Sequence, residues 1–245
     1  MDRAVSELVV AGSRPARTHG GLVVSVENSL FTSSFLAACA RSLSSWHDSF
    51  TVIVADDLMA YNKLHMKGAP EEFWRLIRQY RHDRQTHLTR LRRSLRLSAD
   101  RMRIGFYGDY CDREYSQVMR RFYMIVMTDG HLFDLFHEEA SGFTARSMAS
   151  DGEGWTAEQR YRSSMAYLIE ETVWTVYLYA TKGITDIYYP GDFGHLIESV
   201  YTHGRYGEIL AFLGLPRHSS RFWNLRRASD GRVERKLAWR YGDGS

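Results

Sequence analysis

The chain has 245 residues, of which 44% are hydrophobic and 25% are charged, and its formal net charge at pH 7 is +3. A chain of this length and composition can fill one core, and so small a net charge confines any strong basicity to local segments. No stretch approaches the roughly 20 uninterrupted apolar residues of a membrane span, and the amino end lacks the apolar run of a signal peptide.

These properties favour a single cytoplasmic domain over residues 1–245, a monomer, with peripheral tails at 1–19 and 217–245. The two cysteines, Cys39 and Cys111, have no second thiol at metal-ligand spacing. Isolated thiols of this kind are ordinary in a reducing compartment. We therefore expect no metal, no cofactor and no membrane partner.

Strands and helices alternate along the chain. Short β-branched runs predict strands at 21–26, 50–55, 101–107 and 186–189. Amphipathic stretches predict helices at 29–43, 72–97, 114–137, 156–181 and 194–203. This order is typical of βαβ units, so we predict an α/β fold, a doubly wound Rossmann-like domain with a mostly parallel sheet. Ligands of such folds bind at the carboxyl ends of the strands.

The first predicted strand leads into Ser25, with Asn28 and Ser29 as capping residues for the helix that follows. Backbone N–H groups at a helix start can stabilise an oxyanion, so Ser25 is a candidate nucleophile. The alternative is an ordinary turn serine. The G-x-S-x-G elbow of hydrolases is absent, because Val23 and Glu27 occupy its glycine positions.

The helix expected over 72–97 carries a row of arginines with few acids to offset them. A helical wheel gathers its apolar residues on one side, namely Phe73, Leu76, Ile77, Tyr80, Leu91 and Leu95. The opposite side carries Arg75, Arg78, Arg81, Arg92, Arg93 and Arg96. Uncompensated arginines repel one another unless an anion neutralises them, which predicts nucleic-acid phosphates as the partner. The alternative is a solvated surface helix. The segment after 216 is also basic, and it either docks on the same anion or is a solvated end.

Two further motifs place polar groups near the predicted strand ends. Tyr167 and Glu171 are four residues apart and therefore share one helix face. A phenol beside a carboxylate can hold an ammonium group and relay a proton, although a core tyrosine beside a solvated glutamate would give the same spacing. Tyr189 precedes Pro190 at the end of a predicted strand, in a string that is often only a turn.

In this order, the motifs resemble those of the cyclodipeptide synthases, enzymes that build diketopiperazines from two aminoacyl-tRNAs. The resemblance covers about residues 22–192. It implies a fold similar to the catalytic domain of tyrosyl- and tryptophanyl-tRNA synthetases. It also implies two aminoacyl-tRNAs as substrates and no cofactor.

The resemblance assigns roles to individual residues. It implies that Ser25, near Asn28, is the nucleophile, that Tyr167 and Glu171 hold the aminoacyl ammonium group, that Glu171 shuttles protons, and that Tyr189 assists. The residues expected by analogy to bind substrate are Val23, Val52, Tyr107, Trp174 and Asp192. Those expected to bind tRNA are Arg81, Arg84, Arg90, Arg92, Arg93 and Arg96.

The expected reaction is a ping-pong sequence through aminoacyl-Ser25 and dipeptidyl-Ser25 intermediates. An aminoacyl-tRNA is already an activated ester, which agrees with the lack of a P-loop and of synthetase-like ATP motifs in the sequence. A transferase that passes the aminoacyl group to another amine would share every motif. A tRNA-binding protein without activity would be free to lose Ser25 or Glu171, and both are present.

The chain departs from the family's two subgroups. One subgroup has the equivalent of Asn28, and the other has a proline after the late tyrosine. This chain combines Asn28 with Pro190, and Leu30 replaces a frequent tyrosine. The substrate rules of either subgroup therefore do not transfer to it.

Overall fold

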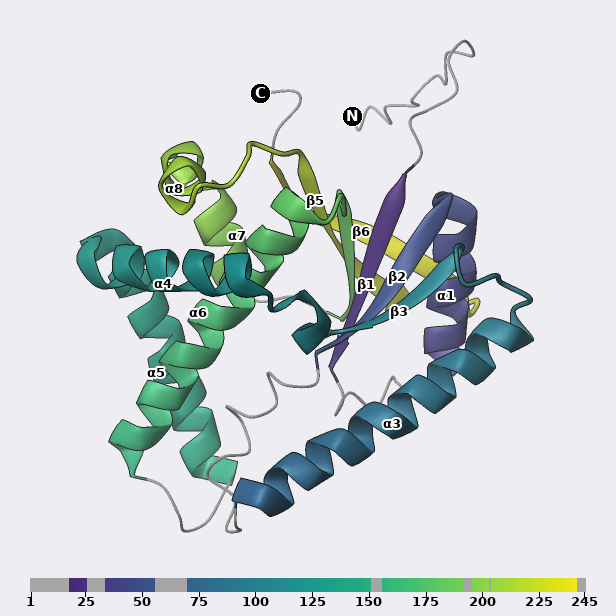
Figure 1. Cartoon of the computed structure of the whole chain (residues 1–245), viewed down its shortest axis with the longest axis horizontal. Coiled ribbons are helices and arrows are strands. Elements are labelled where there is room, and N and C mark those ends of the chain that lie inside the picture. The colour runs from purple at the N-terminus through teal and green to yellow at the C-terminus, as the bar shows by residue number, and fades with distance from the viewer. Residues whose placement is uncertain are drawn as a thin grey trace.

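A computed structural model of the chain describes residues 18–25, 34–55, 70–150, 156–191, 195–202 and 204–241 (Figure 1). Its centre is a six-stranded sheet of order β3-β2-β1-β4-β5-β6. The strands are β1 (His19–Ser25), β2 (Ser49–Ala55), β3 (Met102–Phe106), β4 (Asp186–Pro190), β5 (Ser220–Arg227) and β6 (Val233–Tyr241). All neighbours are parallel except β5 and β6. The predicted α/β class and mostly parallel sheet are confirmed.

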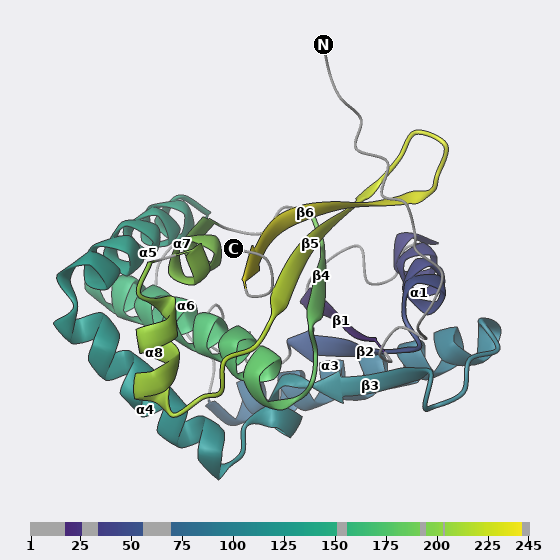
Figure 2. The same cartoon turned by 90° about the horizontal axis from the view of Figure 1, so that it is seen from above.

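Helices cover both faces of the sheet. They are α1 (Ser34–Trp46), α3 (Pro70–Ser94), α4 (Arg113–Thr128), α5 (Gly130–Ser150), α6 (Ala157–Thr181), α7 (His195–Thr202) and α8 (Tyr206–Leu213), with a short 3-10 helix, η2 (Tyr107–Tyr110), after β3. Side chains of α1 and α3 pack with one face of the sheet, and those of α4 to α8 pack with the other. Figure 2 shows α4 to α8 gathered on one side and α1 on the other.

The strand order reverses next to β1. From β1 the chain adds β2 and β3 on one side, and then returns to add β4 and β5 on the other. Neighbouring connections leave a doubly wound sheet in opposite directions at this point, which makes room for a ligand at the carboxyl ends of β1 and β4. In the described part of the chain, no helix is long and apolar enough to cross a membrane.

Helix α6 begins at a capping box. Thr156 Oγ1 accepts a hydrogen bond from Gln159 N at 3.2 Å, and Gln159 Oε1 accepts one from Thr156 N at 2.9 Å. This pair satisfies backbone donors that a helix start leaves unpaired. Eight consecutive residues, 172–179, are buried, so this stretch of α6 is covered on every side.

The predicted helix over 114–137 is wrong in one respect, because the structure has two helices there. Helix α4 ends at Thr128, and Asp129 takes an extended conformation. The Asp129 carboxylate then accepts a hydrogen bond from Leu132 N at 3.1 Å, at the start of α5. An Asp-Gly pair can stop one helix and cap the next, since Asp favours caps over helix interiors.

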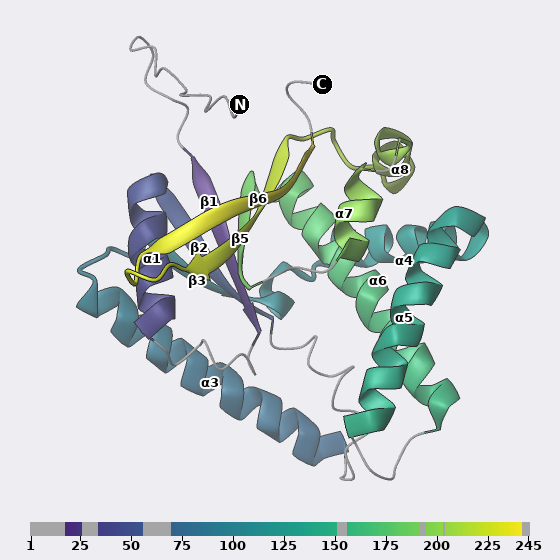
Figure 3. The same ribbon diagram turned by 180° about the vertical axis from the view of Figure 1, so that it is seen from behind.

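The expected tail over 217–245 is also corrected, because most of it forms β5 and β6. Phe222 and Leu225 of β5 are buried, and Figure 3 shows the hairpin of β5 and β6 reaching toward α1. Arg235 of β6 lies between the rings of Trp46 and Trp223, at 4.7 and 4.8 Å from their centroids. Part of the basic charge in this segment therefore holds the sheet to α1.

Candidate active site

The carboxyl end of β1 lies at the point where the strand order reverses. Leu22 of β1 pairs in parallel register with Tyr188 of β4. The printed pairing of β1 with β2 continues to the end of β1, whereas its pairing with β4 ends at Leu22 and Tyr188. Ser25 is also the last residue of β1 and pairs with Ala55 of β2. The predicted nucleophile position therefore falls where a doubly wound sheet binds its ligands.

Three of the predicted groups lie outside the described residues. These are Asn28, Asp192 and the side chain of Ser25. Their roles stay predictions.

Tyr167 and Glu171 are one helical turn apart on α6, as their spacing predicts. The Tyr167 hydroxyl donates a hydrogen bond to Glu171 Oε1 at 3.1 Å. Tyr189 of β4 interacts electrostatically with both. All three side chains are half-buried. The fold thus brings together two phenols and a carboxylate from helix α6 and from β4, the strand next to β1.

Burial raises the pKa of the Glu171 carboxyl from 4.5 to about 7, and the hydrogen bond from Tyr167 opposes part of this rise. A carboxyl group whose pKa is near the working pH can both accept and return a proton, as an acid–base catalyst must. Burial, followed by the charge of Glu171, also raises the pKa of Tyr167 and that of Tyr189. Both phenols therefore keep their protons at neutral pH and can donate hydrogen bonds.

An aromatic cluster surrounds Trp174 of α6. Its ring centroid lies 5.1 Å from that of Tyr107 and 6.4 Å from that of Tyr110. The Tyr107 hydroxyl hydrogen-bonds the Tyr115 hydroxyl at 2.7 Å and donates to Glu170 Oε1. Burial, with Tyr115 and Glu170, raises the pKa of Tyr107. Tyr107 and Trp174, both predicted to bind substrate, are in contact here.

Glu170 is not among the residues that the sequence predicted for the site. Its position beside Glu171 gives no signal, because adjacent helical residues point about 100° apart and serve different neighbours. Its partner Tyr107 is 63 residues away in the sequence, so only the tertiary fold shows the pair.

Two valines were predicted to line the substrate pocket, and the sheet separates them. Val23 packs with the cluster that contains Tyr107 and Trp174. Val52 is fully buried in the cluster on the other face, with α1 and α3. Residues of a buried strand alternate between its two faces, so Val52 is removed from the proposed pocket.

The apolar side predicted for the arginine helix is correct for most of its described members. Ile77 is buried, and Tyr80, Leu91 and Leu95 are half-buried against the same cluster. Leu76 is 40% exposed, which corrects its predicted burial. Fully buried Leu88 is a core residue that the wheel omitted. The side chain of Phe73 lies outside the described residues.

The predicted tRNA-binding arginines occupy different settings. Arg90 and Arg93 are exposed on α3, and Arg84 is half-buried. Arg81 pairs with Asp109 and lies over the Phe106 ring, 4.4 Å from its centroid. These contacts place one flank of α3 against the carboxyl end of β3.

The remaining two predicted arginines, Arg92 and Arg96, are not simply exposed on the helix as the wheel predicted. Arg92 is half-buried and donates a hydrogen bond to the Met102 carbonyl at 3.3 Å. Arg96 lies beyond the end of α3, with a φ of 55°. The exposed positions Arg90 and Arg93 are therefore the better test of phosphate contact.

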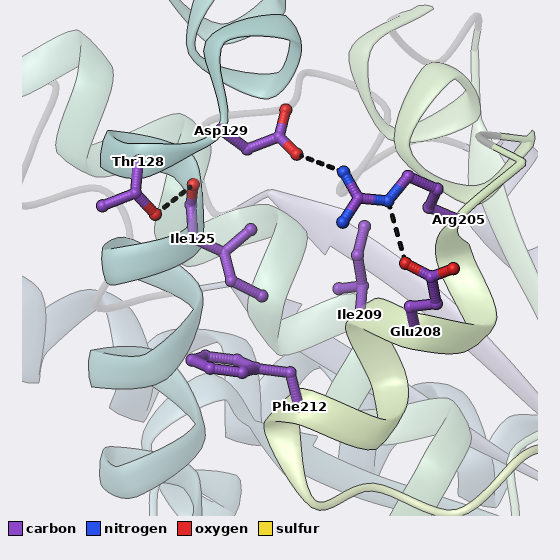
Figure 4. A pocket seen from close by; sticks show the side chains of 7 residues that line it. All are labelled: Ile125, Thr128, Asp129, Arg205, Glu208, Ile209 and Phe212. Carbon is purple, nitrogen blue, oxygen red and sulfur yellow. Dashed lines mark hydrogen bonds and ion pairs between the residues drawn. The ribbon is translucent and has the colours of Figure 1, made fainter.

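A separate cavity lies between α4 and α8 (Figure 4). Its volume is about 510 Å³. Arg205 spans its edge, with 2.9 Å ion pairs to Asp129 and Glu208. The residues that line it are Ile125, Thr128, Asp129, Arg205, Glu208, Ile209 and Phe212. None of the predicted site residues contributes to it.

Among the residues that the structure describes, no group of three or more His, Cys, Asp or Glu side chains could hold a metal ion.

No protein-family model and no curated protein matches the chain, but solved structures do. A CDPS from Fluoribacter dumoffii superposes with a TM-score of 0.67 at 16% identity, over 78% of this chain and 84% of that one. AlbC, a cyclodipeptide synthase from Streptomyces noursei, gives a TM-score of 0.57 at 17% identity, over 89% of this chain and 93% of that one.

A Mycobacterium tuberculosis protein, whose structure relates cyclodipeptide synthetases to type I tRNA synthetases, gives a TM-score of 0.54 at 14% identity, over 76% of this chain and 78% of that one. The chain therefore has the fold of the cyclodipeptide synthases. The relation of that protein to type I tRNA synthetases agrees with the expected similarity to synthetase catalytic domains.

Proposed function

We propose that the chain is a tRNA-dependent cyclodipeptide synthase that joins two aminoacyl groups into a diketopiperazine through esters on Ser25. The observation that carries the proposal is the position of Glu171. This carboxyl is half-buried, accepts a hydrogen bond from Tyr167, and interacts with Tyr189 near the end of β4. The predicted nucleophile ends the neighbouring strand β1.

In the first step, the Ser25 hydroxyl oxygen attacks the ester carbonyl of an aminoacyl-tRNA. The bond between the carbonyl carbon and the tRNA ribose oxygen breaks, and the serine proton passes to that oxygen. The activation of the ester supplies the driving force, so the step needs no ATP. The product is an aminoacyl-Ser25 ester and free tRNA.

Tyr167 and Glu171 then hold the ammonium group of the bound amino acid. Glu171 takes one of its protons, because a carboxyl with a pKa of about 7 is often ionised at neutral pH and becomes a fair acid once protonated. The freed amine attacks the ester of a second aminoacyl-tRNA, and the proton passes to the departing ribose oxygen.

The dipeptidyl ester closes in the last step. Its terminal amine attacks the seryl ester carbonyl, the bond to Ser25 breaks, and the serine oxygen recovers a proton. Tyr189, whose raised pKa keeps it protonated, donates a hydrogen bond to the intermediate and assists this transfer. The enzyme is restored and the cyclic dipeptide is released.

The direct test combines two measurements on the Ser25→Ala variant. We expect no new cyclic dipeptide in the medium of a bacterium that expresses it, and no aminoacyl mass increment on the protein after incubation with labelled aminoacyl-tRNAs. Ser45→Ala, at an exposed serine of α1, is the matched control and should behave as wild type. An adduct on the Ser25→Ala protein would remove Ser25 from the mechanism. A wild-type adduct without a cyclic product would instead indicate transfer to another amine.

A further inference from the structure

A large aromatic side chain is exposed among the arginines of α3. Trp74 lies in the first turns of the helix and is 44% exposed. Its neighbours Arg75 and Arg78 are exposed as well. Surface tryptophans tend to mark binding sites, because leaving so large an apolar surface in water is unfavourable.

The helical geometry defines the flank that carries Trp74. Trp74, Arg78 and Arg81 are spaced i, i+4 and i+7, so they follow one side of α3. Arg81 is fixed against Asp109 and Phe106, directly after the carboxyl end of β3. Trp74 therefore lies about 10 Å from Arg81 along the helix axis, on the flank that faces the strand ends.

An indole beside guanidinium groups suits one kind of ligand, a single-stranded nucleic acid. The arginines contact phosphates, and the flat apolar ring stacks on an unpaired base of any identity. An apolar protein partner would use the indole but would leave the neighbouring arginine charges without a counterpart. The acceptor arm of a tRNA ends in unpaired nucleotides, and the last of them carries the amino acid.

We propose that Trp74 stacks on an unpaired base at the 3′ end of the tRNA acceptor arm and so guides the aminoacyl end toward the strand ends. The inference rests on the proposed tRNA-dependent function. It adds a base-stacking contact to the phosphate contacts of the arginines. Because stacking involves no charge, its contribution to affinity should not depend on salt in the way the arginine contacts do.

The test uses two RNA hairpins with the same stem, one with a four-nucleotide unpaired 3′ extension and one blunt. Trp74→Leu should weaken binding of the extended hairpin by roughly 5- to 150-fold, the range typical of one stacked base. Binding of the blunt hairpin should stay within twofold of wild type, and the salt slope should not change. Trp74→Phe keeps a ring and should recover most of the affinity. Leu76→Ala, an exposed apolar residue elsewhere on the same helix, is the control.

Two outcomes would overturn the inference while leaving the proposed function intact. One is equal weakening of both hairpins by Trp74→Leu, which would indicate a structural role for the indole. The other is unchanged binding of both. Failure of the wild-type protein to bind either hairpin would instead reject both the inference and tRNA binding by this helix.

Discussion

Helices α3 and α6 have the same length, 25 residues each, but opposite surroundings. Residues 172–179 of α6 are all buried. In α3, among the side chains that the structure describes, only Ile77 and Leu88 are buried, and four arginines are exposed, namely Arg75, Arg78, Arg90 and Arg93. The exposed arginines of α3 can attract a polyanion through their charge. The surroundings of α6 can shift the pKa of a side chain on that helix, because they remove it from water.

In the proposed function, this contrast assigns RNA binding to α3 and catalysis to α6. Burial raises the pKa of Glu171, which suits this carboxyl to proton transfer. Exposure keeps the arginine side chains of α3 accessible to phosphates. Changes in α6 should therefore affect the reaction, and changes in α3 should affect the salt-dependent binding of RNA.

The largest effect is expected for Glu171→Gln. The variant keeps the shape of the side chain and loses its charge and basicity, so formation of the cyclic product should fall by roughly 100- to 10,000-fold. The first acylation should persist, because Ser25 attacks an ester that is already activated. Intact-protein mass spectrometry should then show an aminoacyl adduct that accumulates. RNA affinity should be unchanged, and a product yield near that of wild type would remove Glu171 from the mechanism.

The burial of Glu171 should also make the free energy of unfolding of the substrate-free protein depend on pH. Its pKa is about 7 in the folded chain and 4.5 as the ordinary value, so the folded state holds a proton that the unfolded state releases between these pH values. The free energy of unfolding should therefore fall as pH rises through this window, by on the order of 3 kcal/mol from this group.

Glu171→Gln should remove that fall. The measurement is urea unfolding of both proteins at pH 5 and pH 8, and the difference between them isolates the residue from other titrating groups. If the free energy of unfolding changed with pH equally in the two proteins, the pKa of Glu171 would not be raised by burial.

Adjacent residues of α3 offer a sharper test of which side of that helix packs. Ile77 is 3% exposed and Leu76 is 40% exposed. Ile77→Ala should cost about 2–3 kcal/mol of the free energy of unfolding, because it opens a cavity, whereas Leu76→Ala should cost less than about 0.5 kcal/mol. Chemical denaturation of the two variants measures both values. Equal costs would mean that α3 packs on a different side.

The smallest effect is expected for the double variant Arg90→Ala plus Arg93→Ala, and it concerns RNA binding. If each contacts one phosphate, the slope of log affinity against log salt should become less steep by about 1.4–1.8. Turnover at saturating aminoacyl-tRNA should be preserved. Arg113→Ala plus Arg120→Ala removes the same charge from exposed positions of α4 and should leave the slope as it is. If the α3 and α4 double variants had the same salt slope, the arginines of α3 would be better interpreted as a solvated surface.

Local patterns in the sequence predicted much of this arrangement. The strand-helix order and the Tyr167–Glu171 pairing depend on spacings of a few residues, which short-range geometry determines. Val52 was misplaced because β2 is buried on both faces, and a continuous apolar run hides which residues face which side. Leu76 was misplaced because the packing of a helix depends on neighbours that a wheel does not contain.

The C-terminal strands could not be predicted for a related reason. Arginines dominate this segment, and charge is normally a sign of solvent exposure. The guanidinium of Arg235 packs on aromatic faces supplied by Trp223 of the neighbouring strand β5 and by Trp46, which is far away in the sequence. Such partners become visible only after the fold is known.

The same guanidinium has a practical consequence for how far the protein can be shortened. Arg235 also donates a hydrogen bond to the Tyr188 hydroxyl at 3.2 Å, and Tyr188 precedes Tyr189 in β4. Trp239, later in β6, is buried against the helices on the other face. Strand β6 thus contacts the helices on both faces of the sheet, and it hydrogen-bonds Tyr188, the residue next to the proposed catalytic Tyr189. The smallest fragment worth expressing should therefore retain the whole of β6.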